Sequence, residues 1–313
     1  MTASHKYNLK TMREDFKKQG LFYTPPELAE WLKSLIPPNP RRVYDPTCGR
    51  GALLSVFADD VAKYGQDIDA DAIADATYNL TNFRGAIGDV LHNPVFIEER
   101  FDAIVANPPF SVKWKSTHDG YFAFAPTVPT DSRADFAFLI HILWMLDDNG
   151  TAAVINFPGV AYRGGREYTL RRWMIEQNAI DQVIHIPGDT FTDTSIATIC
   201  IVFKKGRQRT DITFTDREHG ITRNVPYDEI VERDFTLSVQ SYIQQEIEKP
   251  IVNTAALEAD ARAKAIKRVH NELRMSYLIS QIEGWPFDDF VDAIRHEIDS
   301  TIKELRTQNP MDL

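Results

Sequence analysis

The chain has 313 residues and a mass of 35.7 kDa, which leaves room for one domain and a small appendage. Its 43% hydrophobic and 26% charged residues are typical of a globular protein and exclude wholesale disorder or a collagen-like repeat. No run approaches the ~18 apolar residues of a membrane-spanning helix, and the N-terminal residues lack the apolar core of a signal peptide. We therefore expect a cytoplasmic protein without a membrane partner.

Charge and cysteine content further limit the classes of protein to which the chain can belong. The net charge is −10, but residues 211–313 contain 12 basic and 20 acidic residues, whereas residues 1–210 contain 23 basic and 25 acidic ones. Phosphate neutralisation supplies most of the affinity for DNA, so the nearly neutral first part is compatible with a nucleic-acid enzyme that binds DNA weakly alone. The two cysteines, Cys48 and Cys200, form neither a disulfide framework nor a zinc-site pattern, so we expect both to be structural and expect no metal.

Between residues 42 and 207, short apolar runs alternate with helical patterns. The predicted strands are Arg42–Tyr44, Lys63–Gln66, Phe101–Ala106, Thr151–Asn156, Asp181–Ile186 and Ala197–Phe203. The predicted helices are Ala52–Ala58, Ala70–Asn79, Ala134–Leu146 and Leu170–Gln177. This alternation predicts an α/β fold, with a mostly parallel sheet covered by helices on both faces. Ligands of such sheets bind at the carboxyl ends of the strands.

The remaining regions differ in character. Ser111–Arg133 is a long connection with little periodicity, which favours a lid or binding loop, although a disordered surface loop is the alternative. Residues 211–252 are expected to form an extended connecting segment. Apolar positions at helical spacing in Ala255–Ile282 and Phe290–Leu305 then predict a C-terminal helical hairpin over residues 253–313. Its apolar stripe either packs on the body or awaits a partner.

The segment Val43–Leu54 carries the first chemical motif. Asp45 ends a strand, and Gly49 and Gly51 allow the backbone to approach a ligand closely. Asp67 follows the next strand and can grip ribose hydroxyls with two acceptor oxygens. A glycine-rich turn alone is common to many nucleotide-binding folds, and an acid in a loop is often merely solvated.

Two later motifs extend this pattern. Asp89, in Gly88-Asp89-Val90, can accept a hydrogen bond from an adenine amino group. The strand Phe101–Ala106 runs into Asn107-Pro108-Pro109-Phe110, where the prolines stiffen the backbone. The Asn107 side-chain oxygen and the Pro108 carbonyl can accept both hydrogens of an exocyclic amino group, which frees its lone pair for attack, and Phe110 offers a stacking face. A proline-stiffened turn with a buried Phe is the structural alternative.

The ordered set of motifs resembles the gamma-type amino-methyltransferases that make N6-methyladenine in DNA. It is most similar to the modification subunit of type I restriction-modification systems. The resemblance spans residues 20–207 and includes Phe22–Pro25, DPTCGRG, GQDID, GDV, NPPF, Arg133–Leu146, Phe157–Pro187 and Phe191–Lys205.

The resemblance implies a Rossmann-like S-adenosylmethionine-dependent methyltransferase domain over residues 1–210. S-Adenosylmethionine would be the methyl donor, with Thr24 hydrogen-bonded to its methionine end. The implied donor-binding residues are Tyr23, Thr24, Asp45, Cys48, Gly49, Gly51, Asp67, Ile68, Asp89, Val90 and Asn107. The implied catalytic residues are Asn107, Pro108, Pro109 and Phe110. Phe110 and Phe191 would stack on a flipped-out adenine, although a core role is nearly as plausible for Phe191.

The resemblance also implies partners and leaves alternatives. Double-stranded DNA would be the substrate, a specificity subunit would dock on residues 253–313, and a restriction subunit is possible. Two departures stand out: Arg50 occupies a position that is usually Ser, and only some 20 residues precede the Phe22–Pro25 motif, where modification subunits carry a helical domain. The alternatives are an RNA or protein-glutamine methyltransferase with the same NPPF chemistry, and a degenerate scaffold.

Overall fold

The computed structural model describes residues 24–117, 120–188, 197–243 and 254–308. Tyr23 and Phe191, two of the predicted site residues, lie outside these ranges. The chain divides into two compact units, residues 1–245 and residues 246–313. Within the described ranges, no helix combines the length and apolar character that crossing a membrane requires.

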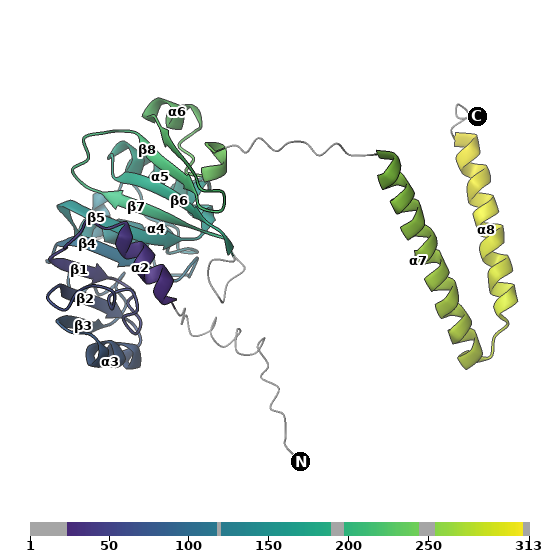
Figure 1. The fold of residues 1–313 in the computed structure, drawn as a ribbon, viewed down its shortest axis with the longest axis horizontal. Helices are drawn as coiled ribbons and strands as arrows, with labels where there is room; N and C mark the ends of the chain where they lie inside the picture. Colours follow the sequence, from purple (N-terminus) through teal and green to yellow (C-terminus); the bar gives the residue numbers. More distant parts are fainter. Residues whose placement is uncertain (1–23, 118–119, 189–196, 244–253, 309–313) are drawn as a thin grey trace, which may run out of the picture. The chain divides into compact units, whose positions relative to one another are not determined.

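The first unit is built on one nine-stranded sheet in the order β3-β2-β1-β4-β5-β7-β6-β8-β9 (Figure 1). The strands are β1 (Arg42–Asp45), β2 (Ala62–Asp67), β3 (Phe83–Ile87), β4 (Phe101–Ala106), β5 (Leu146–Asn156), β6 (Ile180–Ile186), β7 (Thr198–Lys204), β8 (Ile212–Asp216) and β9 (Ile221–Val225). Strands β1 to β5 are mutually parallel, β7 is antiparallel to β5 and β6, and β6 is parallel to β8. The carboxyl ends of β1, β2, β4, β5, β6 and β8 therefore share one edge.

The six predicted strands are confirmed, with ends within two residues except at the start of β5. That strand begins at Leu146 rather than Thr151. The sequence pattern missed β3 because this strand is largely exposed and Gly85 interrupts its apolar residues.

Helices cover both faces of the sheet (Figure 1). They are α2 (Pro26–Ser34), α3 (Ala70–Asn79), α4 (Asp135–Met145), α5 (Arg166–Glu176) and α6 (Tyr227–Glu232), with 3-10 turns η1 (Gly120–Phe124), η2 (Pro158–Ala161) and η4 (Val239–Ser241). Successive residues of a strand enter different cores: Ile104 packs with the α4 and α5 side chains, whereas Val105 packs in the cluster that contains Leu32 of α2. This arrangement confirms the predicted fold, a mostly parallel sheet with helices on both faces.

The helix predicted over Ala52–Ala58 is wrong. The segment forms successive turns, in which the backbone N–H of Leu54 and that of Ser55 both donate to the Gly51 carbonyl at 3.0 Å. A seven-residue helix is marginal by itself, and burial of Leu53, Leu54 and Phe57 is achieved equally well by turns.

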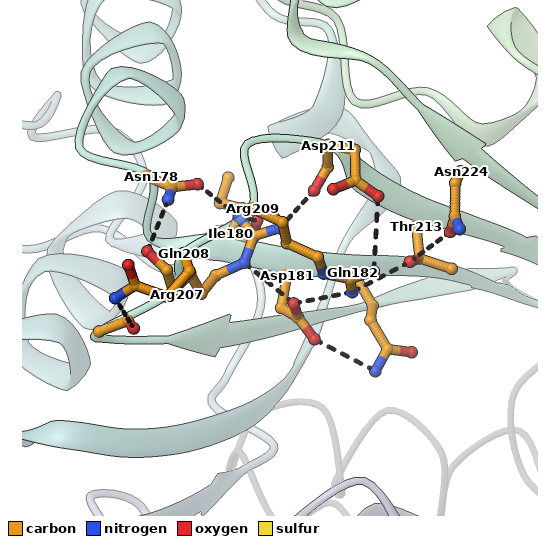
Figure 2. Close-up of polar contacts among 11 residues, drawn as sticks. Asn178, Ile180, Asp181, Gln182, Arg207, Gln208, Arg209, Asp211, Thr213 and Asn224 are labelled. Atoms are coloured by element: carbon orange, nitrogen blue, oxygen red, sulfur yellow. Dashed lines mark hydrogen bonds and ion pairs between the residues drawn. The ribbon is translucent and has the colours of Figure 1, made fainter.

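The predicted connecting segment also needs correction, because residues 211–243 belong to the sheet unit. Strand β8 pairs with β6, and Ile212 and Phe214 are buried. Figure 2 shows what anchors this junction: the buried Arg207 donates to Asp181 at 2.9 Å and also bonds the carbonyl of Asp211. The guanidinium thus joins the start of β6 to the chain entering β8.

The second unit contains the two predicted helices, α7 (Thr254–Glu283) and α8 (Phe287–Gln308). Gly284, with φ +73°, ends α7, and the rings of Tyr277 and Phe287 meet across the turn at 5.2 Å. Among the described side chains of this unit, only Ser280 is buried. Its large apolar residues are at least 40% exposed at Ile266, Val269, Met275, Leu278, Ile279, Ile282, Ile298 and Ile302.

Candidate active site

Three neighbouring strands bring the predicted acidic and amide residues to one edge of the sheet. Strand β1 lies between β2 and β4, and Asp45 ends β1 while Asp67 ends β2. Asn107 directly follows β4. The structure therefore places Asp45, Asp67 and Asn107 on adjacent strand ends, as the sequence pattern predicts for a ligand site.

Asp45 lies deepest in this group. It is 1% exposed, and its carboxylate accepts a hydrogen bond from the Thr47 backbone N–H at 3.0 Å. Burial raises the pKa of Asp45 from 3.8 to about 8, with a further contribution from the negative charge of Asp67. A cationic ligand at this strand end would favour the ionised carboxyl group.

The turn after β1 is organised around two glycines with positive φ. At Gly49, with φ +50°, an added Cβ would meet no atom within 4 Å, so this part of the turn faces open space. At Gly51, with φ +83°, a Cβ would lie 2.6 Å from Cδ1 of Leu80. Gly49 thus leaves room for a ligand, whereas Gly51 is required by packing against the end of α3.

Asp67 links this turn to the next strand. Its Oδ2 accepts the Gly49 backbone N–H at 2.7 Å, and its Oδ1 accepts that of Asp69 at 3.0 Å. Each carboxylate oxygen keeps capacity for a second donor. Ile68 beside it is 73% exposed and offers an apolar face at the same strand end. Asp69 caps α3 by accepting from the N–H groups of Asp71 and Ala72.

Asp89 lies after β3 and is exposed. Its Oδ1 accepts the Leu91 backbone N–H at 3.0 Å, and its Oδ2 lies 2.6 Å from Nδ1 of His92. The other ring nitrogen of His92 lies 2.8 Å from the carbonyl of Lys115. Hydrogen bonding to Asp89, followed by that to Lys115, raises the pKa of His92. His92 therefore couples Asp89 to the connection that follows β4, a contact the sequence did not indicate.

The described part of the connection Ser111–Arg133 is held by hydrogen bonds and by packing in the core. The Ala134 N–H donates to the Val112 carbonyl at 2.9 Å and the Trp114 N–H to the Asp131 carbonyl at 3.0 Å, so its two ends are joined. Tyr121 and Phe122 of η1 are buried in the main core. The described part of this connection is thus anchored to the sheet.

Besides Asp45, three of the predicted donor-binding residues that the structure describes have buried side chains. Cys48 is 5% exposed and its sulfur lies against Gly65, while Val90 is 3% exposed within the apolar core. Burial raises the pKa of the Cys48 thiol and that of Cys200 far above the usual range. The side chains of Cys48 and Val90 are therefore not available to a ligand. Thr24 is also buried, two residues before the start of α2.

The turn after β4 combines a stiff backbone with an available amide. Pro108 is buried, and Phe110 packs partly against the cluster that contains the α2 side chains. Among the described residues, none hydrogen-bonds to the half-buried side-chain amide of Asn107. Ser111, which follows Phe110, has φ +52° and donates to the buried carboxylate of Asp135.

Asp135 belongs to a group of charges that the sequence did not predict. Arg163 lies 3.8 Å from the Asp135 carboxylate and 3.6 Å from Glu167, and Arg133 lies 3.3 Å from Glu167. Both acids are buried. Arg133 and Arg163 stand in segments that carry the family resemblance, but only the fold shows that they converge behind the Asn107 turn.

A second unpredicted group lies at the ends of β6 and β8. Ligand atoms of His185, Asp216 and Glu218 lie within 4.8 Å of one another. Asp216 already bonds His185 at 3.4 Å, His219 at 2.9 Å and the Glu218 backbone N–H at 3.0 Å. These contacts hold the turn after β8 against β6.

Comparison with known proteins agrees with this geometry. A family model described as N-6 DNA Methylase matches residues 5–225. The chain belongs to this family. The match covers both the turn after β1 and the turn after β4, and it extends through β9, in agreement with the position of that strand in the sheet unit.

Individual members of the family are similar over much of the chain. The type I restriction enzyme MpnII methylase subunit of Mycoplasma pneumoniae is 30% identical over 93% of the chain and 59% of its own length. The HindI methylase subunit of Haemophilus influenzae is 26% identical over 70% of the chain and 53% of its own length. The chain thus spans little more than half the length of these relatives.

Solved structures agree in fold. A type I restriction-modification methyltransferase subunit from Streptococcus thermophilus superposes with a TM-score of 0.64 at 28% identity, covering 71% of this chain and 59% of that one. A putative class I S-adenosylmethionine-dependent methyltransferase from Listeria monocytogenes gives a TM-score of 0.51 at 17% identity over 66% of this chain and 71% of that one. The sheet unit therefore has the fold of S-adenosylmethionine-dependent methyltransferases.

Proposed function

We propose that this protein transfers a methyl group from S-adenosylmethionine to N6 of a flipped-out adenine in DNA. We further propose that it acts as the modification subunit of a type I-like restriction-modification complex, with which a restriction subunit can associate. The observation that carries the proposal is the available Asn107 amide on a proline-stiffened turn, adjacent to the strand ends of Asp45 and Asp67. Because its proposed substrate is chromosomal DNA, we place the protein in the cytoplasm.

The strand ends fit the donor. Asp67 keeps two acceptor positions for ribose hydroxyls. Ile68 suits an adenine ring and Asp89 suits its amino group. The open backbone at Gly49 leaves room for the methionine part of the donor. The buried Asp45 suits a cation, and S-adenosylmethionine carries a sulfonium and an ammonium group. When bound, it supplies the methyl group to be transferred.

The turn after β4 then acts on the target base. The amino group of an adenine inside a duplex is out of reach, so the base must leave the stack. Asn107 and the Pro108 carbonyl accept its two amino hydrogens, which orients the nitrogen lone pair, while Phe110, together with Phe191, stacks on the ring. Since both cysteines are buried, the residues contribute by positioning and electrostatics rather than by a covalent intermediate.

Labelled donor tests the substrate class directly. The protein, with its co-purified subunits, is incubated with methyl-labelled S-adenosylmethionine and with DNA, RNA or protein, and the products are analysed by mass spectrometry. We expect label in N6-methyladenine of DNA. Label confined to RNA or to protein glutamine would establish the alternative chemistry, which the methylase-subunit relatives do not favour. Absence of transfer to all three, with the donor bound, would indicate a scaffold.

The exposed apolar residues of α7 and α8 support a partner for the second unit. Such side chains on paired helices suit docking against helices of another protein, and we propose that a specificity subunit is this partner. Adding that subunit should confer sequence-specific methylation, and deleting residues 253–313 should remove the gain. Efficient methylation of a defined site by the purified chain alone would instead show a self-sufficient enzyme.

A further inference from the structure

The turn that presents Asn107 ends in an unusual backbone conformation. Ser111 has φ +52°, in the left-handed region, one residue after Phe110. A residue with a Cβ is disfavoured there by roughly tenfold or more relative to the ordinary helical region, and glycine is not. Something else in the structure must therefore hold Ser111 in this conformation.

Asp135 at the start of α4 makes the contacts that do so. Its Oδ1 accepts the Ser111 backbone N–H at 3.1 Å, and its Oδ2 accepts the Ser111 hydroxyl at 3.4 Å. Asp135 is only 4% exposed, so these bonds are shielded from water. The carboxylate therefore fixes the direction in which the chain leaves the Asn107 turn.

The charge of Asp135 is balanced from the loop after β5. The Arg163 guanidinium lies 3.8 Å from its carboxylate and is itself only partly exposed. Room for this guanidinium exists because residue 159 is a glycine. A Cβ at this position would overlap the guanidinium. The turn after β4 is thus supported by α4 and by the loop after β5 together.

We propose that Asp135 is a positioning residue for methyl transfer, which holds Ser111 left-handed and thereby aims the Asn107 amide and the Phe110 ring. The inference rests on the proposed function, because it gives Asn107 and Phe110 their roles toward the base. A buried ion pair that served stability alone would have no particular effect on turnover by a folded enzyme.

The test compares Asp135→Ala, Ser111→Gly and the double variant in the full chain with its co-purified subunits. Asp135→Ala should lower kcat for DNA methylation on the order of 10- to 100-fold, as expected for losing hydrogen bonds to a charged group. The KM for S-adenosylmethionine should stay within about twofold, because the donor contacts lie on other strands. The double variant should regain roughly tenfold in kcat, since glycine adopts the left-handed conformation freely.

Amide hydrogen exchange provides a readout that does not depend on activity. Peptides covering residues 107–112 should exchange faster in Asp135→Ala, because the Ser111 N–H loses its acceptor, and they should stay unprotected in the double variant, which lacks the same acceptor. If the wild type failed to methylate adenine, the proposed function would fall, while this exchange pattern would still decide whether Asp135 sets the turn. Unchanged exchange in Asp135→Ala would overturn the positioning role.

Asp181→Ala is the matched control, because Asp181 is also a buried acid paired with an arginine, Arg207, but lies at the opposite end of the strands. It should lower the melting temperature without changing kcat at a temperature where the protein is folded. Should Asp135→Ala not fold, Asp135→Asn keeps an acceptor for Ser111 and should show a smaller loss of kcat that Ser111→Gly again restores. A loss of kcat that Ser111→Gly restores in neither background would overturn the proposal that Asp135 acts through the conformation of Ser111.

Discussion

The turns after β1 and β4 leave the same sheet edge from adjacent strands, yet they are built differently. The first reaches positive φ with Gly49 and Gly51 and is tied to its neighbour by a hydrogen bond to Asp67. The second is stiffened by prolines and ends in a left-handed Ser111 held by a buried acid. We propose that the first presents its backbone to the donor and that the second presents one amide in a fixed direction. Changes in the first should therefore alter donor binding, and changes in the second should alter turnover.

Asn107→Ala should have the largest effect, and this effect should fall on turnover rather than on donor affinity. Removing the proposed acceptor of the amino hydrogens should reduce methyl transfer by ~100-fold or more, a typical loss for one preorganised polar group. Donor affinity, measured by calorimetry, should remain within about twofold. Substantial residual turnover would show that another group holds the amino nitrogen.

Asp67→Ala should have the complementary effect. It removes the acceptor for the Gly49 N–H and the proposed acceptor for the ribose, and each charge-assisted bond contributes ~1.5–3 kcal/mol. We expect S-adenosylmethionine to bind at least ~10-fold more weakly, with kcat at saturating donor little changed. Unchanged affinity in calorimetry would overturn the ribose assignment.

The pH dependence of donor binding tests whether the donor senses the Asp45 carboxyl group at the end of β1. Because burial raises the pKa of Asp45 to about 8, a cationic donor should release a proton from it below that pH. Affinity should rise with pH by at most about tenfold per unit up to pH ~8 and then level off. The carboxyl group of the unfolded chain ionises near pH 3.8. The raised pKa of Asp45 should therefore also lower the stability of the donor-free protein as the pH rises from about 4 toward 8.

Titration calorimetry in buffers of different ionisation enthalpy measures the released proton. Asp45→Asn serves as the control, because it should abolish the proton release and flatten the pH profile of affinity. A wild-type profile that is flat between pH 6 and 8 would show that the donor does not sense this carboxyl group.

These contrasts explain which parts of the molecule the sequence could reveal. Most strands were predictable, because buried strands such as β4 and β7 are mostly apolar runs. Asp45, Asp67 and Asn107 then mark the ends of β1, β2 and β4. Asp135 was not, because an acid beside a helix start usually indicates an exposed first turn, and only tertiary packing buries it against Ser111.

Two of the errors arise because local patterns do not report tertiary packing. Ala52–Ala58 has a helical pattern, but burial of its apolar residues in turns satisfies the same pattern without a helix. Residues 211–243 looked like a connection because their strands are short, and the buried Arg207 that joins them to β6 has partners remote in the sequence. Local patterns therefore report the strand ends well and the long-range polar contacts poorly.

Gly49→Ala and Gly51→Ala form a matched pair within the first turn. Both impose strain of ~1–2 kcal/mol from positive φ, but the new Cβ of Gly51→Ala would also lie 2.6 Å from Leu80. Urea unfolding should therefore show a larger loss of stability for Gly51→Ala. Calorimetry should show the larger loss of donor affinity for Gly49→Ala, whose position faces open space. A larger loss of donor affinity for Gly51→Ala would mean that Gly51, rather than Gly49, lines the donor site.

Arg50→Ser, which installs the residue that the family resemblance implies at this position, should have the smallest effect. Arg50 forms an ion pair with Asp75 of α3, and both side chains are well exposed. Such pairs contribute ~0–1 kcal/mol, so urea unfolding should detect little change. Because the side chain extends toward α3 rather than along the glycine backbone that would meet the donor, affinity for S-adenosylmethionine should stay within about twofold. A marked loss of affinity would mean that Arg50 reaches the donor, and that the first turn binds through a side chain as the second does.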